Sequence, residues 1–143
     1  MANEQVRKRI LFVDDEVGIR LTLPRILAKH GFDVTVVASV ADAIAEIAAQ
    51  KFDALLSDLN LPLPNEGFVV IDVMRREQPW CVNFILTGYP GDASAVQAVD
   101  HEAAHYFTKP VEIEELVNTI NGELAATLTP RGVAGVKKKP GNS

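Results

Sequence analysis

Short apolar segments alternate along this chain with longer segments that have helical spacing. The apolar segments are short, rich in β-branched or aromatic residues and bounded by polar or turn residues, as buried strands are; they cover residues 10–13, 34–37, 54–56, 82–86 and 106–107. Between them, hydrophobic residues recur with the spacing of one helix face, as in residues 19–27, 41–48, 70–74 and 113–124. Five strands, each followed by a helix, predict a mostly parallel sheet that helices cover on both faces.

Prolines interrupt this pattern in two places. Pro24 lies within the first helical segment and predicts a kink there, because its ring removes the hydrogen bond to the Arg20 carbonyl. The segment 61–67 is rich in proline, asparagine and glycine, and we expect it to be a rigid, turn-rich loop.

The chain length fits one domain with a sizeable core. We expect residues 1–8 to be an N-terminal tail and residues 9–126 to form the domain. Residues 127–143 contain two prolines, three glycines and little to bury. This composition predicts a flexible tail or linker, and the lysines 137–139 belong to its solvated surface.

Charge and cysteine content exclude several classes of function. Nineteen acidic and fourteen basic residues give a net charge of −5, which argues against direct nucleic-acid binding, because that needs clustered lysine and arginine. The single cysteine, Cys81, cannot form an internal disulfide, so we expect a reducing cytoplasm. The start of the chain has no apolar run typical of a secretion signal, and no segment reaches the roughly 18 apolar residues of a membrane span.

Chemically active side chains follow four of the five predicted strands. Asp14 and Asp15 end the first strand and Asp58 ends the third, while Thr87 and Lys109 end the fourth and fifth. In an open parallel sheet, ligands bind beyond the carboxyl ends of the strands. The sequence therefore predicts that these side chains share one edge of the sheet.

Three crowded carboxylates repel one another, and a hard divalent cation such as Mg²⁺ removes this conflict. Such an ion also neutralises charge on a transferring phosphoryl group and leaves one carboxylate free to act as a nucleophile. Lys109 adds a positive charge for a phosphoryl oxygen, and Thr87 adds a hydroxyl donor. This set of groups favours phosphoryl transfer, which needs mainly positioning and charge stabilisation.

The segments ILFVDDE, LLSDLNLP, ILTG and YFTKP, in this order and spacing, resemble the CheY-like receiver domain of two-component response regulators. The resemblance covers about residues 9–126. It implies an α/β, flavodoxin-like, doubly wound (βα)5 fold, with a parallel five-stranded sheet of order 2-1-3-4-5. It also implies a cis peptide bond between Lys109 and Pro110.

The resemblance assigns a role to each acidic residue. Asp58 becomes the phosphoacceptor, which takes a phosphoryl group from a sensor histidine kinase or a phosphotransfer protein. Asp14, Asp15, Asp58 and the backbone carbonyl of Asn60 become ligands of Mg²⁺, with Mn²⁺ as an alternative. The chain would catalyse only its own phosphorylation and dephosphorylation, so it is not expected to be an enzyme.

The resemblance also implies a conformational switch. Lys109 and Thr87 would bind the phosphoryl group, Thr87 would move toward it, and Tyr106 would turn into the space that Thr87 leaves. The surface of helix 92–101, the fifth strand and helix 112–126 would then control a downstream protein or output domain, or form a homodimer. Whether the chain is a stand-alone receiver or part of a longer regulator stays open.

Simpler readings exist for single residues. Asp58 could cap a turn, Asp14 or Asp15 could cap the first helix, and Glu16 is expected to be a solvated residue of the first helical turn. The three histidines, His30, His101 and His105, lack metal-ligand spacing and are expected at the surface or an edge.

Three alternative functions remain. A hydrolase of the haloacid dehalogenase type also uses an aspartate nucleophile, but its nucleophile usually lies on the first strand. A flavodoxin-like cofactor binder would need a phosphate loop after the first strand, where this chain carries acids. A degenerate receiver that acts only by binding would not need the intact set of acids, hydroxyl and lysine.

Overall fold

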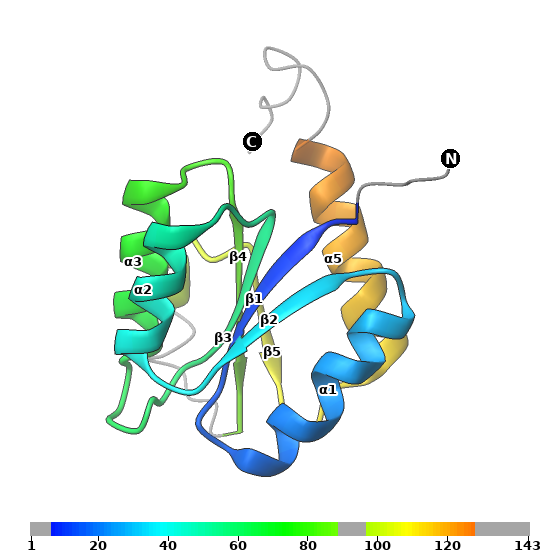
Figure 1. The fold of residues 1–143 in the computed structure, drawn as a ribbon, viewed down its shortest axis with the longest axis horizontal. Coiled ribbons are helices and arrows are strands. Elements are labelled where there is room, and N and C mark those ends of the chain that lie inside the picture. The colour runs from blue at the N-terminus through cyan, green and yellow to red at the C-terminus, as the bar shows by residue number, and fades with distance from the viewer. Residues whose placement is uncertain (1–6, 89–96, 128–143) are drawn as a thin grey trace.

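Five parallel strands form one sheet in the order β2-β1-β3-β4-β5 (Figure 1). The computed structural model describes residues 7–88 and 97–127. The strands are β1 (Arg9–Val13), β2 (Asp33–Val37), β3 (Ala54–Asp58), β4 (Val82–Thr87) and β5 (His105–Thr108). The predicted fold class and strand order are confirmed.

Helices cover the two faces of this sheet. The helices α1 (Val17–Lys29) and α5 (Ile113–Thr127) lie on one side, and α2 (Val40–Ala49) and α3 (Gly67–Glu77) lie on the other (Figure 1). Residues 97–100 are also helical. α1 continues through Pro24, which is buried inside the helix without ending it. Ser39 caps the start of α2, and its hydroxyl accepts a hydrogen bond from the Asp42 backbone N–H at 3.1 Å.

The core has two layers, one on each face of the sheet. Alternate residues of β1 enter different layers: Ile10 and Phe12 pack with α1 and α5, whereas Leu11 and Val13 pack with α2 and α3. Side chains of a strand point alternately to opposite faces, so a sheet covered on both faces needs continuous apolar strands. This explains the short apolar runs in the sequence.

Both predicted tails lie largely outside the described residues, which exclude 1–6 and 128–143. α5 extends to Thr127, one residue beyond the predicted domain boundary. Within the two described ranges, no helix combines the length and the apolar character that crossing a bilayer requires.

Candidate phosphoacceptor and metal site

The register of the sheet brings the predicted site residues to one edge. Val13 is opposite Ser57, so Asp14 and Asp58 follow at neighbouring positions. Asp58 is in turn opposite Leu86, one residue before Thr87.

The same register extends to β5. Thr87 is opposite Thr108, which places Lys109 directly beyond it, and the Lys109 backbone N–H donates to the Thr87 carbonyl at 2.8 Å. Four strands thus present their final polar residues side by side.

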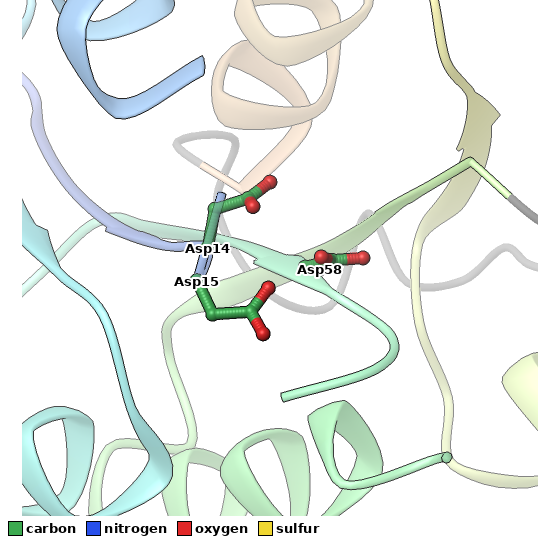
Figure 2. A group of neighbouring side chains, drawn as sticks. All are labelled: Asp14, Asp15 and Asp58. Atoms are coloured by element: carbon green, nitrogen blue, oxygen red, sulfur yellow. The ribbon is translucent and has the colours of Figure 1, made fainter. Parts of the chain in front are cut away.

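Three carboxylates converge at this edge. Asp14 and Asp15 follow β1, and Asp58 ends the neighbouring β3 (Figure 2). Each offers one carboxylate oxygen, and these oxygens all lie within 4.8 Å of one another. Asp14 is fully buried and Asp58 is 7% exposed, whereas Asp15 faces solvent. Hard divalent cations prefer such all-oxygen sets, with water completing the coordination, so the residues fit the predicted Mg²⁺ or Mn²⁺.

Hydrogen bonds fix the orientation of Asp14. Its Oδ1 accepts from the Glu16 backbone N–H at 2.9 Å, which lies at the start of α1. Its backbone N–H donates to the Val37 carbonyl, and its carbonyl accepts from Arg20 Nη1 at 3.0 Å. Asp14 therefore both supports the start of the helix and faces the acidic cluster.

Lys109 is the cation at the centre of this cluster. Its Nζ lies 2.9 Å from Asp14 Oδ2 and 3.4 Å from Asp58 Oδ2, and its side chain is only 15% exposed. Burial by itself lowers the pKa of Lys109, but its hydrogen bond and charge interaction with Asp14 and the charge of Asp58 together raise it above the usual value. The ammonium therefore stays charged. The following Lys109–Pro110 peptide bond is cis, as predicted.

Asp58 has an unusual proton affinity for an aspartate. Burial, and next the charge of Asp14, raise the pKa of Asp58 from 3.8 to about 6, although Lys109 and the Asn60 backbone N–H act in the opposite direction. Crowding by like charge and loss of water both disfavour the ionised form. A bound cation would relieve both effects.

The loop after β3 holds Asn60 beside Asp58, and both residues line one cleft at this edge of the sheet. The Asn60 side-chain Oδ1 accepts from the Asn65 backbone N–H at 3.0 Å, and Asn65 has a left-handed φ of 66°. Gly67 closes the loop through a 2.7 Å hydrogen bond from its N–H to the Leu59 carbonyl. This arrangement agrees with the predicted turn-rich loop.

The two predicted switch residues lie on adjacent strands. Thr87 is fully buried at the end of β4. Tyr106 on β5 is half-buried and packs against the core layer of α2 and α3. Its hydroxyl is buried and has no hydrogen-bond partner in the described part of the chain. Half of the predicted helix 92–101, residues 92–96, and most of the loop before it lie outside the described residues.

The structure adds a contact to the prediction for Glu16. Its side chain is 63% exposed, as expected of a solvated residue, but Glu16 lies one position before α1 and its Oε1 is 3.3 Å from Lys109 Nζ. The sequence offered only a weak signal, a third acid directly after the aspartate pair.

A cleft next to the cluster was also not predicted. It has a volume of about 970 Å³ and extends from Asp58 along one side of α1 to the segment after β5. Its apolar lining residues are Ile19, Leu23, Ile26, Val111 and Ile113. Sequence periodicity placed the α1 residues on one helix face, and Leu23 indeed belongs to the core layer of α1 and α5, with Ile19 packed against it.

The strand order and the buried acids with their lysine define a CheY-like receiver domain. The model of the response regulator receiver domain matches residues 10–121. The chain belongs to this family.

Individual relatives support this assignment. The transcriptional regulatory protein TcrA of Mycobacterium tuberculosis (strain ATCC 25618 / H37Rv) is 33% identical over 108 residues, which are 76% of this chain but 42% of TcrA. This chain thus spans less than half the length of that relative.

Two solved structures share the fold. The CheY-like receiver domain protein from Methanospirillum hungatei JF-1 is 28% identical, with a TM-score of 0.80 over 85% of this chain and 97% of that one. A Burkholderia pseudomallei response regulator, solved with a phosphorylated aspartic acid, a calcium ion and citrate, is 30% identical, with a TM-score of 0.75 over 82% and 69% of the two chains.

Proposed function

We propose that this chain is a phosphorylation-controlled switch that accepts a phosphoryl group on Asp58. The observation that carries the proposal is the contact of Asp58 with both Lys109 and the aspartate pair that can hold a divalent cation. The Burkholderia response regulator, solved with a phosphorylated aspartic acid and a calcium ion, supports the same chemistry.

In the proposed reaction, an Asp58 carboxylate oxygen attacks the phosphorus of a phosphohistidine on a sensor kinase or phosphotransfer protein. The O–P bond forms as the P–N bond breaks, and the electron pair of that bond returns to the histidine nitrogen. Water later attacks the phosphorus, which regenerates the carboxylate and releases phosphate. The chain catalyses only these changes to itself.

Residues of the site have separate tasks in this reaction. Lys109 faces the carboxylate at 3.4 Å and stabilises the negative charge of the transferring group. Asp14 and Asp15, together with Asp58 and the Asn60 carbonyl, would hold Mg²⁺. The bound ion supplies further charge neutralisation for the phosphoryl oxygens. Thr87 would donate its hydroxyl to the same group.

The apolar cleft beside Asp58 supports a protein as the phosphoryl donor. The partly exposed Ile19 and Ile26 and the buried Leu23 line it from α1, and the residues after β5 line its other side. Partly exposed apolar surface next to a reactive group suits a docking partner, because burying it contributes free energy of association.

We further propose that phosphorylation changes the surface formed by residues 92–101, β5 and α5, through Thr87 and Tyr106. That surface would control a downstream protein or output domain, or form a homodimer. A shift of the active population from about 1:99 to 99:1 requires about 5.5 kcal/mol. Charge-assisted hydrogen bonds to a group that carries about −1.5 to −2 charges reach this order when combined with repacking. We place the receiver at residues 9–126, a flexible tail or linker at 127–143 and the protein in the cytoplasm.

Acetyl phosphate with Mg²⁺ and intact-mass measurement tests the reaction. We expect the wild-type chain to gain the mass of one phosphoryl group, and Asp58→Asn to gain none. Asp100→Asn, which changes an exposed acid, should behave as the wild type. A folded wild-type protein that gains no mass, or Asp58→Asn that gains it equally, would refute the proposal. Turnover of a generic phosphate ester would instead favour a hydrolase.

A further inference from the structure

Glu16 makes a contact that the proposed phosphoryl transfer does not use. Its Oε1 lies 3.3 Å from Lys109 Nζ, as close as Asp58 Oδ2, which lies at 3.4 Å. The Glu16 side chain is 63% exposed, whereas the Asp58 side chain is 10% exposed. Lys109 is therefore shared between the buried nucleophile and an acid at the rim of the site.

Neither metal binding nor helix capping explains the position of this carboxylate. Among the described residues, the acids whose oxygens converge are Asp14, Asp15 and Asp58, without Glu16. Glu16 precedes α1, but its side chain makes no capping hydrogen bond. Its recorded side-chain partner is the ammonium of Lys109.

A phosphoryl group on Asp58 adds new acceptors for the hydrogen-bond donors of Lys109. An ammonium has three donors, and those of Lys109 already face three carboxylates. The phosphoryl group adds strong acceptor oxygens and about −1.5 to −2 charges. Glu16 then competes for the same donors and also repels the new anion. Both effects oppose phosphoryl binding.

We propose that Glu16 is a positioning residue that draws Lys109 toward the rim and thereby lowers the affinity of the site for a phosphoryl group. The proposal rests on the proposed function of Asp58. It predicts that removing the Glu16 charge increases the affinity for a phosphoryl group, whereas replacing a residue that merely supports the fold would decrease it.

Beryllofluoride, a phosphoryl mimic, tests this proposal in saturating Mg²⁺, with binding followed by backbone amide NMR. We expect Glu16→Gln to bind it about twofold to fivefold more tightly than the wild type, in line with a partly exposed ion pair. Glu77→Gln is the matched control, because Glu77 is an exposed acid in the last turn of α3, paired with Arg76. The affinity of this variant for beryllofluoride should equal that of the wild type. Unchanged or weaker binding by Glu16→Gln overturns the proposal.

Calorimetric titration with Mg²⁺ alone gives a second readout. Loss of a metal ligand or of its direct support weakens metal binding by about tenfold or more. We expect a much smaller change for Glu16→Gln, so a weakening of that size would place Glu16 in the metal site and overturn its assigned role.

The wild-type titration separates the two proposals. If the wild type does not bind beryllofluoride, the proposed function of Asp58 fails, and the role of Glu16 fails with it. If the wild type binds beryllofluoride and Glu16→Gln does not bind it more tightly, only the proposed role of Glu16 fails.

Discussion

Asp58 is buried beside other acidic side chains, and both conditions destabilise the folded protein when Asp58 is ionised. Its ionised form is disfavoured because burial and Asp14 raise the pKa to about 6. At neutral pH without metal, the folded chain must nevertheless carry this charge. We therefore expect Asp58→Asn to raise the free energy of unfolding by about 1–3 kcal/mol at pH 7. Urea denaturation in the presence of a chelator measures it, and a destabilised variant would contradict this account.

The same carboxyl group predicts a pH dependence with a definite sign. Its folded-state pKa of about 6 lies above the usual 3.8, so between these values the folded protein binds more protons than the unfolded chain. The contribution of Asp58 to stability is present below this window and is lost as the pH rises through it. The free energy of unfolding of Asp58→Asn should therefore exceed that of the wild type by an amount that grows from pH 4 to pH 7. A constant difference would show that Asp58 does not titrate in this window.

Gly67 packs against the backbone of Asp58. A Cβ atom at this position would overlap the Asp58 carbonyl oxygen and lie 2.9 Å from Leu59 Cα. Backbone cannot move aside as a flexible side chain can, so Gly67→Ala should destabilise the fold by about 1–3 kcal/mol. Gly122→Ala is the control, because nothing lies within 4 Å of its added Cβ; this exposed helical site should be neutral or slightly stabilised. Thermal unfolding of both variants tests the difference.

At the scale of elements, α3 is joined to the end of the helical segment 97–100 by a cluster of side chains. His101 Nδ1 lies 2.6 Å from Asp72 Oδ1, and its ring stacks on Phe68 with centroids 4.5 Å apart. Arg75 and Glu102 add an ion pair at 3.2 Å, and Glu102 adopts a left-handed φ of 62°. His101 was expected at the surface or an edge; its side chain is 30% exposed and also connects two elements, a contact that was not predicted.

His101→Ala removes both the stacking and the hydrogen bond of this cluster. We expect a loss of about 1–2 kcal/mol in the free energy of unfolding, as aromatic stacking and one partly exposed hydrogen bond together suggest. His30→Ala is a suitable control, because His30 is exposed beyond the end of α1. Equal stability of the two variants would show that the cluster contributes little.

Strands and helices were largely predictable, whereas cross-element contacts were not. Apolar runs and helical spacing found all five strands, because burial on both sheet faces leaves a direct mark on the sequence. Asp14, Asp58, Thr87 and Lys109 were found together because parallel strands end at a shared edge. The contacts of Glu16 with Lys109 and of His101 with Asp72 were not predicted, because only the tertiary fold brings these residues together.

For the whole molecule, metal binding and folding should be coupled. An ion that binds only the folded chain raises its stability with concentration, by about 1.4 kcal/mol at ten times the Kd. We expect MgCl2 to raise the melting temperature of the wild type and to have much less effect on Asp58→Asn, which lacks one of the three converging carboxylates. Calorimetry with matched NaCl controls for ionic strength. Equal shifts for both proteins would exclude Asp58 as a ligand.

The close packing of Gly67 on Asp58 also restricts how a modification can be transmitted. On the β3 side, the Asp58 carbonyl packs so closely against the beginning of α3 that a Cβ added to Gly67 would overlap it. On the opposite flank, Gly88 would accept an added Cβ at 3.7 Å from the Lys109 side chain. We therefore expect a displacement at Asp58 to be accommodated more readily toward Gly88, at the end of β4, than toward α3.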